Sequence, residues 1–140
     1  MNRNIRFAVV LLTISPTLTG AGASADVVAV VSAKNDVQAL TLDQLTDIFL
    51  GRVSRFPNGL LAVPIDLREG SPERDQFYAR ITGKTPAQIK AYWSKIIFTG
   101  RGQPPRALPT DVDVKKFIAA NAGAIGYIDA ALLDGSVRAL

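Results

Sequence analysis

The stretch Ala62–Phe77, AVPIDLREGSPERDQF, combines a strand, a turn and a helix start. Its apolar beginning predicts a buried strand, and Gly70 predicts a tight turn. Ser71 followed by Pro72 is typical of a helix start, because serine is a preferred N-cap and proline presets φ for the first helical position. The first N–H groups of such a helix have no backbone partner and carry partial positive charge.

This turn predicts a candidate site for a small oxyanion such as phosphate, sulfate or a carboxylate. Helix N–H groups, a serine hydroxyl and an arginine fork would be its donors, and its residues would be Arg68, Gly70, Ser71 and Arg74. The alternative is a well-capped helix whose arginines pair with nearby acids, which are Asp66, Glu69, Glu73 and Asp75. Those acids would repel an anion and compete for the arginines. The residues alone leave both interpretations open.

The segments on either side predict one α/β domain. Strands are expected at 27–31, 60–65, 124–128 and 136–140, and helices after the caps Thr41, Ser71, Thr85 and Thr110 or Asp111. A loop is expected at 100–109. The order β-α-β-α-α-α-β-β predicts helices that cover a small mixed sheet. Trp93 and Phe117 lie on apolar helical stripes and are expected in its core.

The first 25 residues have the pattern of a secretory signal peptide. Arg3 and Arg6 precede the apolar run Phe7–Ile14, and Ala23-Ser24-Ala25 fits the small-residue cleavage pattern. A retained amphipathic helix is the alternative. Cleavage would leave residues 26–140 as a single, mildly basic domain in the periplasm.

The composition excludes several classes of site. The chain contains no Cys and no His, which excludes disulfides, most zinc and copper sites, and the Ser-His and Cys-His pairs of nucleophilic catalysis. No metal, cofactor or enzymatic activity is expected. The modest charge gives no case for nucleic acid. The N-terminal apolar run is too short to span a bilayer, so no stable membrane insertion is expected.

Three segments together resemble the substrate-binding proteins of phosphate ABC transporters. LTLDQLTDIFLGRVSRFPNG (40–59) resembles that family's helix, its I-[FY]-L-G motif and its W/F-x-[DN]-G turn. IDLREGSPERDQF (65–77) resembles its R-x-D-G-S-G-T-x-x-x-F stretch, and NAGAIGYID (121–129) resembles its G-A-I-G-Y strand. The order and spacing of the three match over residues 27–140. More narrowly, the chain is similar to the short, single-lobe members of this family.

The resemblance implies a single lobe of a type II periplasmic-binding-protein-like fold that binds inorganic phosphate or a similar small anion without catalysis. An ABC transporter permease, or another periplasmic protein, is the implied partner. In the family, G-S-G-T residues at a helix N-terminus hold phosphate together with an upstream arginine. Gly70 and Ser71 match the first two of these, whereas Pro72 and Glu73 replace the others, which removes an N–H donor and a hydroxyl and adds a negative charge.

That family binds phosphate between two lobes, so this chain is expected to supply half of such a site, which a second copy or a partner could complete. The alternative is a periplasmic accessory or sensory interaction domain that has lost solute binding.

Overall fold

The computed structural model describes residues 26–140, so the expected signal peptide at 1–25 lies outside the described residues. Its strands form one sheet in the order β3-β2-β4-β1-β5. They are β1 (Val27–Ser32), β2 (Val63–Leu67), β3 (Arg106–Leu108), β4 (Ala124–Asp129) and β5 (Val137–Ala139). The helices are α1 (Leu42–Phe49), α2 (Pro72–Thr82), α3 (Pro86–Phe98) and α4 (Asp111–Ala120), with a short 3-10 turn at Ala130–Leu132.

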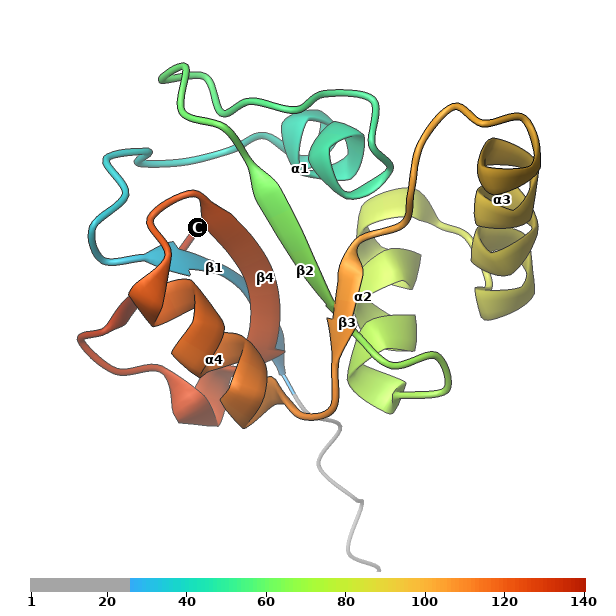
Figure 1. Cartoon of the computed structure of the whole chain (residues 1–140). Coiled ribbons are helices and arrows are strands. Elements are labelled where there is room, and N and C mark those ends of the chain that lie inside the picture. Colours follow the sequence, from blue (N-terminus) through green and yellow to red (C-terminus); the bar gives the residue numbers. More distant parts are fainter. Residues whose placement is uncertain (1–25) are drawn as a thin grey trace, which may run out of the picture.

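The sheet is mixed, and helices cover both of its faces (Figure 1). Alternate side chains of a strand point to opposite faces, and β4 shows what lies on each. Gly126 faces α4 so closely that an added Cβ would lie 2.6 Å from Ile118 Cδ1. The next residue, Tyr127, stacks on Phe77 of α2 with 4.1 Å between ring centroids. The expected α/β fold with a small mixed sheet flanked by helices is confirmed.

The four helices begin where their side-chain caps predict. Thr41 and Thr85 each close a capping box with the glutamine three residues later. Ser71 and Thr110 each accept a hydrogen bond from the backbone N–H three residues on. Gly83 then ends α2 in the left-handed conformation, with φ of 68°, which glycine adopts without steric cost.

The second strand begins at Val63, three residues later than the sequence indicates. Leu61 instead forms a bridge to Arg55 across the turn at 56–59. The apolar run therefore divides between a turn and a strand. The hydrophobic pattern of residues 60–65 does not mark this division, because hydrophobicity does not indicate which strand a residue pairs with.

The expectation of a loop throughout 100–109 is wrong, because this segment contains β3, which pairs in parallel with β2. Arg106–Leu108 lies between Pro105 and Pro109 and is too short to show an alternating pattern. It becomes a strand because β2 offers a free edge. The actual order therefore places a strand between α3 and α4.

The two aromatic residues expected in the core differ in burial. Trp93 is 5% exposed, and its ring lies against Gly51, as expected for a core residue. Phe117 is only partly buried, and the Arg106 guanidinium lies 5.5 Å above its ring. The expectation for Phe117 is confirmed only in part, because its side chain packs against the core but stays partly exposed.

Replacing Trp93 by alanine should lower the free energy of unfolding by about 3–5 kcal/mol, as large-to-small core substitutions do. Phe98 lies on the same helix and is 93% exposed, so Phe98→Ala is the matched control and should change stability by less than about 0.5 kcal/mol. Urea unfolding of both variants measures the difference. Equal losses in the two variants would show that Trp93 does not anchor α3 to the core.

Candidate anion site

A buried carboxylate lies directly behind the predicted anion site. Asp66, on β2, is 3% exposed. Its Oδ2 accepts a hydrogen bond of 2.7 Å from the Tyr78 hydroxyl of α2. Its Oδ1 accepts hydrogen bonds from the Tyr127 hydroxyl of β4 and, at 2.9 Å, from the backbone N–H of Leu67. Hydrogen bonds from two tyrosines therefore join β2 to α2 and to β4.

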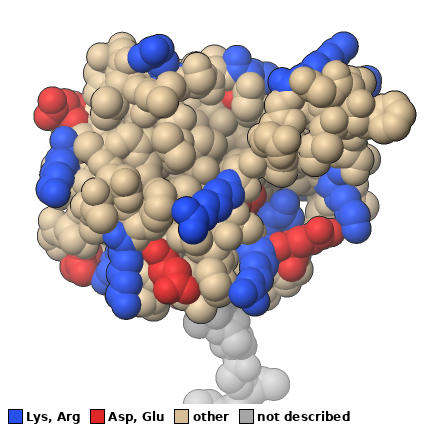
Figure 2. All heavy atoms as spheres, in the orientation of Figure 1, with Lys and Arg blue, Asp and Glu red and all other residues tan. Residues whose placement is uncertain are grey.

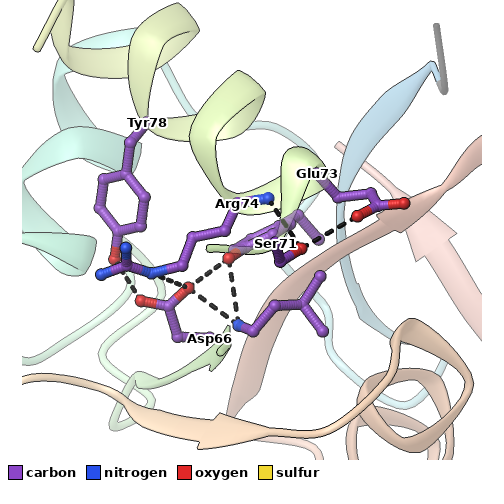
Figure 3. A network of polar contacts seen from close by, with 7 residues as sticks. Asp66, Ser71, Glu73, Arg74 and Tyr78 are labelled. Carbon is purple, nitrogen blue, oxygen red and sulfur yellow. Dashed lines mark hydrogen bonds and ion pairs between the residues drawn. The ribbon is translucent and has the colours of Figure 1, made fainter. Parts of the chain in front are cut away.

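Arg74 completes this cluster. Its Nε lies 3.4 Å from Asp66 Oδ1, and its side chain is 13% exposed. The guanidinium also lies over the ring of Tyr78, at 5.2 Å from the centroid. Figure 3 shows the side chain running from the helix start toward Asp66 and Tyr78, away from Ser71. The positive charge of Arg74 is thus already paired with a carboxylate inside the fold.

Burial raises the pKa of the Asp66 carboxyl above its ordinary value of 3.8. The hydrogen bonds from Tyr127 and Tyr78, the charge of Arg74 and the Leu67 N–H oppose this rise. Burial, with the nearby carboxylate, also raises the pKa of both tyrosines, so they remain donors at any physiological pH.

Ser71 is engaged on the other side of the helix start. Its hydroxyl donates a hydrogen bond of 2.9 Å to the Glu73 carboxylate and accepts one of 3.4 Å from the backbone N–H of Arg74. Figure 3 shows Glu73 beside this hydroxyl. A carboxylate of the chain itself therefore engages the hydroxyl that an external anion at this helix start would use.

The remaining two predicted residues shape the turn. Gly70 has φ of 89°, a conformation that favours glycine. Arg68 is exposed, and its backbone carbonyl accepts a hydrogen bond of 3.1 Å from the Ser71 N–H. Its side chain makes no ion pair with another residue in 26–140. The four predicted residues thus share one turn, but Arg74 and Ser71 face different partners.

A pocket of about 230 Å³ lies beside Ser71, and its lining residues are Leu67, Ser71, Glu73, Pro109, Thr110 and Asp111. It contains none of the other three predicted residues. The start of α2 meets the start of α4 here, because β2 and β3 are parallel neighbours and each leads into one of these helices. Loops that follow the carboxyl ends of parallel strands gather at one edge of the sheet.

Sequence reasoning missed the contribution of Thr110 and Asp111 to this pocket. In the sequence these two residues are recognisable as the start of the helix that follows β3. That start can be assigned to the pocket only when β3 is known to pair with β2. Asp111 also accepts a hydrogen bond of 3.4 Å from the Asp129 N–H. Two carboxylates, those of Glu73 and Asp111, therefore line a pocket at which two positive helix ends meet.

Within residues 26–140, no group of three or more acidic, histidine or cysteine side chains is arranged to hold a metal ion. None of the helices in the same range combines the length and the apolar character that a membrane crossing requires.

The Asp66 carboxyl should make the free energy of unfolding depend on pH. A pKa that is higher in the folded than in the unfolded chain gives stability that is complete below about 3.8 and is lost as pH rises through the folded pKa. The advantage of wild type over Asp66→Asn should therefore shrink as the pH rises above ~4. Urea unfolding across this range measures it.

Tyr78→Phe provides a second variant, since it removes a hydrogen bond that holds the pKa down, and the loss of stability with rising pH should then be steeper. An advantage of wild type that grows with pH would contradict the raised pKa.

The fold matches parts of solved phosphate-transport proteins. A proposed phosphate ABC transporter substrate-binding protein from Clostridium perfringens, solved with bound phosphate, aligns with TM-score 0.63 and 22% identity over 81% of this chain and 43% of its own. A phosphate transport receptor from Vibrio cholerae aligns with TM-score 0.64 and 19% identity, over 81% of this chain and 44% of its own. A candidate phosphate-binding protein from Planctomyces limnophilus aligns with TM-score 0.61 and 17% identity, over 81% of this chain and 40% of its own.

No protein-family model matches the sequence, and a comparison with curated proteins likewise gave no match. The chain spans less than half the length of the three solved proteins. At identities of 17–22% the similarity concerns the fold alone. The chain therefore has a single-lobe, periplasmic-binding-protein-like α/β fold that it shares with part of each phosphate-transport binding protein.

Proposed function

We propose that this chain is an exported, solute-binding-like protein of phosphate transport that holds inorganic phosphate or a similar small oxyanion weakly. The observation that carries the proposal is the meeting of two helix N-termini, capped by Ser71 and Thr110, at one pocket. Each end offers partial positive charge and N–H donors to an anion. The shared fold, including that of a protein solved with phosphate, supports the same conclusion.

The four residues predicted from sequence would have different roles in such a site. Ser71 would turn its hydroxyl from Glu73 to the anion, and Gly70 would keep the turn open. Arg68, exposed and without an ion pair among the described residues, would supply counter-charge from the rim. Arg74 would reach the anion only by leaving Asp66, so in the folded chain it mainly positions the turn.

Binding should be weak for two physical reasons. Pro72 has no N–H to donate. The carboxylates of Glu73 and Asp111 line the same pocket, and like charges about 4 Å apart near a protein surface cost on the order of 4 kcal/mol. We therefore expect a dissociation constant of about 1 mM or weaker, which is no more than about 4 kcal/mol of binding free energy.

The proposed role is in binding and not in catalysis. All three solved proteins are described by binding or transport. A periplasmic location and contact with an ABC transporter permease belong to the proposal, as does completion of the half-site by a second copy or another protein.

A second candidate is a periplasmic accessory or sensory interaction domain that binds no solute. The specific observation in its favour is that Glu73 already accepts a hydrogen bond from the Ser71 hydroxyl, so a donor proposed for the anion is engaged by the chain itself.

Thermal unfolding with phosphate, compared with chloride at the same ionic strength, tests solute binding. Wild type should show a phosphate-specific rise in melting temperature that Ser71→Ala and Arg68→Ala both reduce. Phosphate at 100 times its dissociation constant would stabilise the fold by about 2.7 kcal/mol, and lower concentrations by less. Lys34→Gln, an exposed change of charge on the β1–α1 connection, is the matched control and should keep the shift.

A wild-type chain with no phosphate-specific shift, or a shift that survives both substitutions at the α2 turn, would reject solute binding at Ser71. The interaction-domain alternative would then stand.

Export should produce a mature chain that begins at Asp26, because the expected cleavage pattern ends at Ala25. Mass spectrometry of the periplasmic fraction measures the N-terminus. A chain that keeps Met1 and remains with the cytoplasm or the membrane would reject the export proposal.

A further inference from the structure

Charge is distributed unevenly over this molecule. Residues 76–110 contain no Asp or Glu, and their six basic residues are Arg80, Lys84, Lys90, Lys95, Arg101 and Arg106. The rest of the described chain, 26–75 and 111–140, contains eight basic and twelve acidic residues. In Figure 2 the part of the surface over α3, at the upper right, carries blue atoms and no red ones. The α3 region is thus basic on an otherwise acidic molecule.

The C-terminal end of α3 also exposes two large apolar side chains. Phe98 is 93% exposed and Ile97 is 49% exposed. Lys95 lies three residues before Phe98, so both occupy one face of the helix. Arg101 is held at the helix end by a 3.0 Å hydrogen bond from its N–H to the Ile96 carbonyl. We call these four exposed residues, Lys95, Ile97, Phe98 and Arg101, the α3 tip.

The α3 tip is presented outward by the packing of the rest of the helix. Ile89 and Trp93 form the buried face of α3, which leaves Lys95 and Phe98 on the outer one. Neither Lys95 nor Arg101 makes an ion pair with another residue in 26–140. Lys90 does pair with Glu69, at 3.4 Å, so it is not counted in the tip.

We propose that the α3 tip docks on an anionic phospholipid surface. Basic side chains near such a surface are attracted by its negative potential, and an exposed aromatic ring suits the boundary between headgroups and acyl chains. The tip combines both, and it needs no more than shallow insertion of Phe98 and Ile97. This is a surface contact and not a membrane span, and it does not depend on anion binding at Ser71.

The shape and size of the α3 tip favour lipid over an acidic protein. A stable protein interface buries about 800 Å² on each partner around a packed apolar centre. The side chains of Ile97 and Phe98 provide only a small part of that area. A fluid bilayer surface needs no preformed pocket for a protruding ring. The acidic remainder of the molecule would be repelled by the same surface, which would orient α3 toward it.

Sedimentation with lipid vesicles tests the proposal. The protein should partition onto vesicles of phosphatidylcholine with 30% phosphatidylglycerol, not onto pure phosphatidylcholine, and should leave them as salt rises. Replacing Lys95 and Arg101 by glutamine should weaken partitioning about fivefold for each charge removed. Phe98→Ser should weaken it by about tenfold or more. All variants are compared in the same full-length or processed form, so any contribution from residues 1–25 cancels.

Two matched controls keep the same chemistry at other places. Leu42→Ser removes an apolar side chain that is 55% exposed on α1, and Lys34→Gln with Lys116→Gln removes two exposed charges outside 76–110. Both should retain partitioning within about twofold. The proposal is overturned if wild type does not bind the anionic vesicles or binds neutral ones equally. It is also overturned if the controls lose as much partitioning as the tip variants. Binding of soluble polyglutamate that is equally strong and unchanged by Phe98→Ser would overturn it too, and would indicate an acidic protein as the partner.

Discussion

The buried carboxylate of Asp66 is the constraint on which the rest of the structure depends. Removing a carboxylate from water costs several kcal/mol unless donors replace its hydration. Here the donors come from three elements: Tyr78 and Arg74 of α2, Tyr127 of β4 and the backbone of β2 itself. Satisfying one charge therefore fixes how α2 lies against the two strands, and it orients the turn that begins α2.

That constraint has a direct consequence for ligand binding. Arg74 cannot both neutralise Asp66 and serve an external anion at Ser71, since its guanidinium points into the cluster (Figure 3). The Ser71 hydroxyl is occupied by Glu73, and Asp111 brings a second carboxylate to the pocket. The chain shares its fold with part of each solved phosphate-transport protein, while its own acids engage the groups that an anion would use.

The sequence predicts the local elements well, because their signals are local. Caps at Thr41, Ser71 and Thr85 determine where helices start, and β-branched runs predict β1. It could not predict β3, whose three residues carry no pattern and pair only because β2 lies beside them. It therefore could not show that the starts of α2 and α4 share a pocket, which is a property of parallel topology.

The partners of the arginines were equally beyond sequence reasoning. Four acids lie between positions 66 and 75 around Arg74, and spacing alone does not identify the one that it pairs with. The answer depends on Tyr78 and Tyr127, whose hydroxyls make burial of Asp66 feasible. The same holds for the exposed end of α3, where Phe98 directly follows Ile97 in sequence but lies outside the core that Trp93 enters.

Glu73 competes with an external anion for the Ser71 hydroxyl at the start of α2. Calorimetric titration of inorganic phosphate into wild type and Glu73→Gln, at equal ionic strength, tests this most directly. The variant loses the like charge but keeps the size of the side chain, so it should bind phosphate about tenfold more tightly. A variant that binds phosphate no more tightly than wild type would show that Glu73 does not compete with an anion at this helix start.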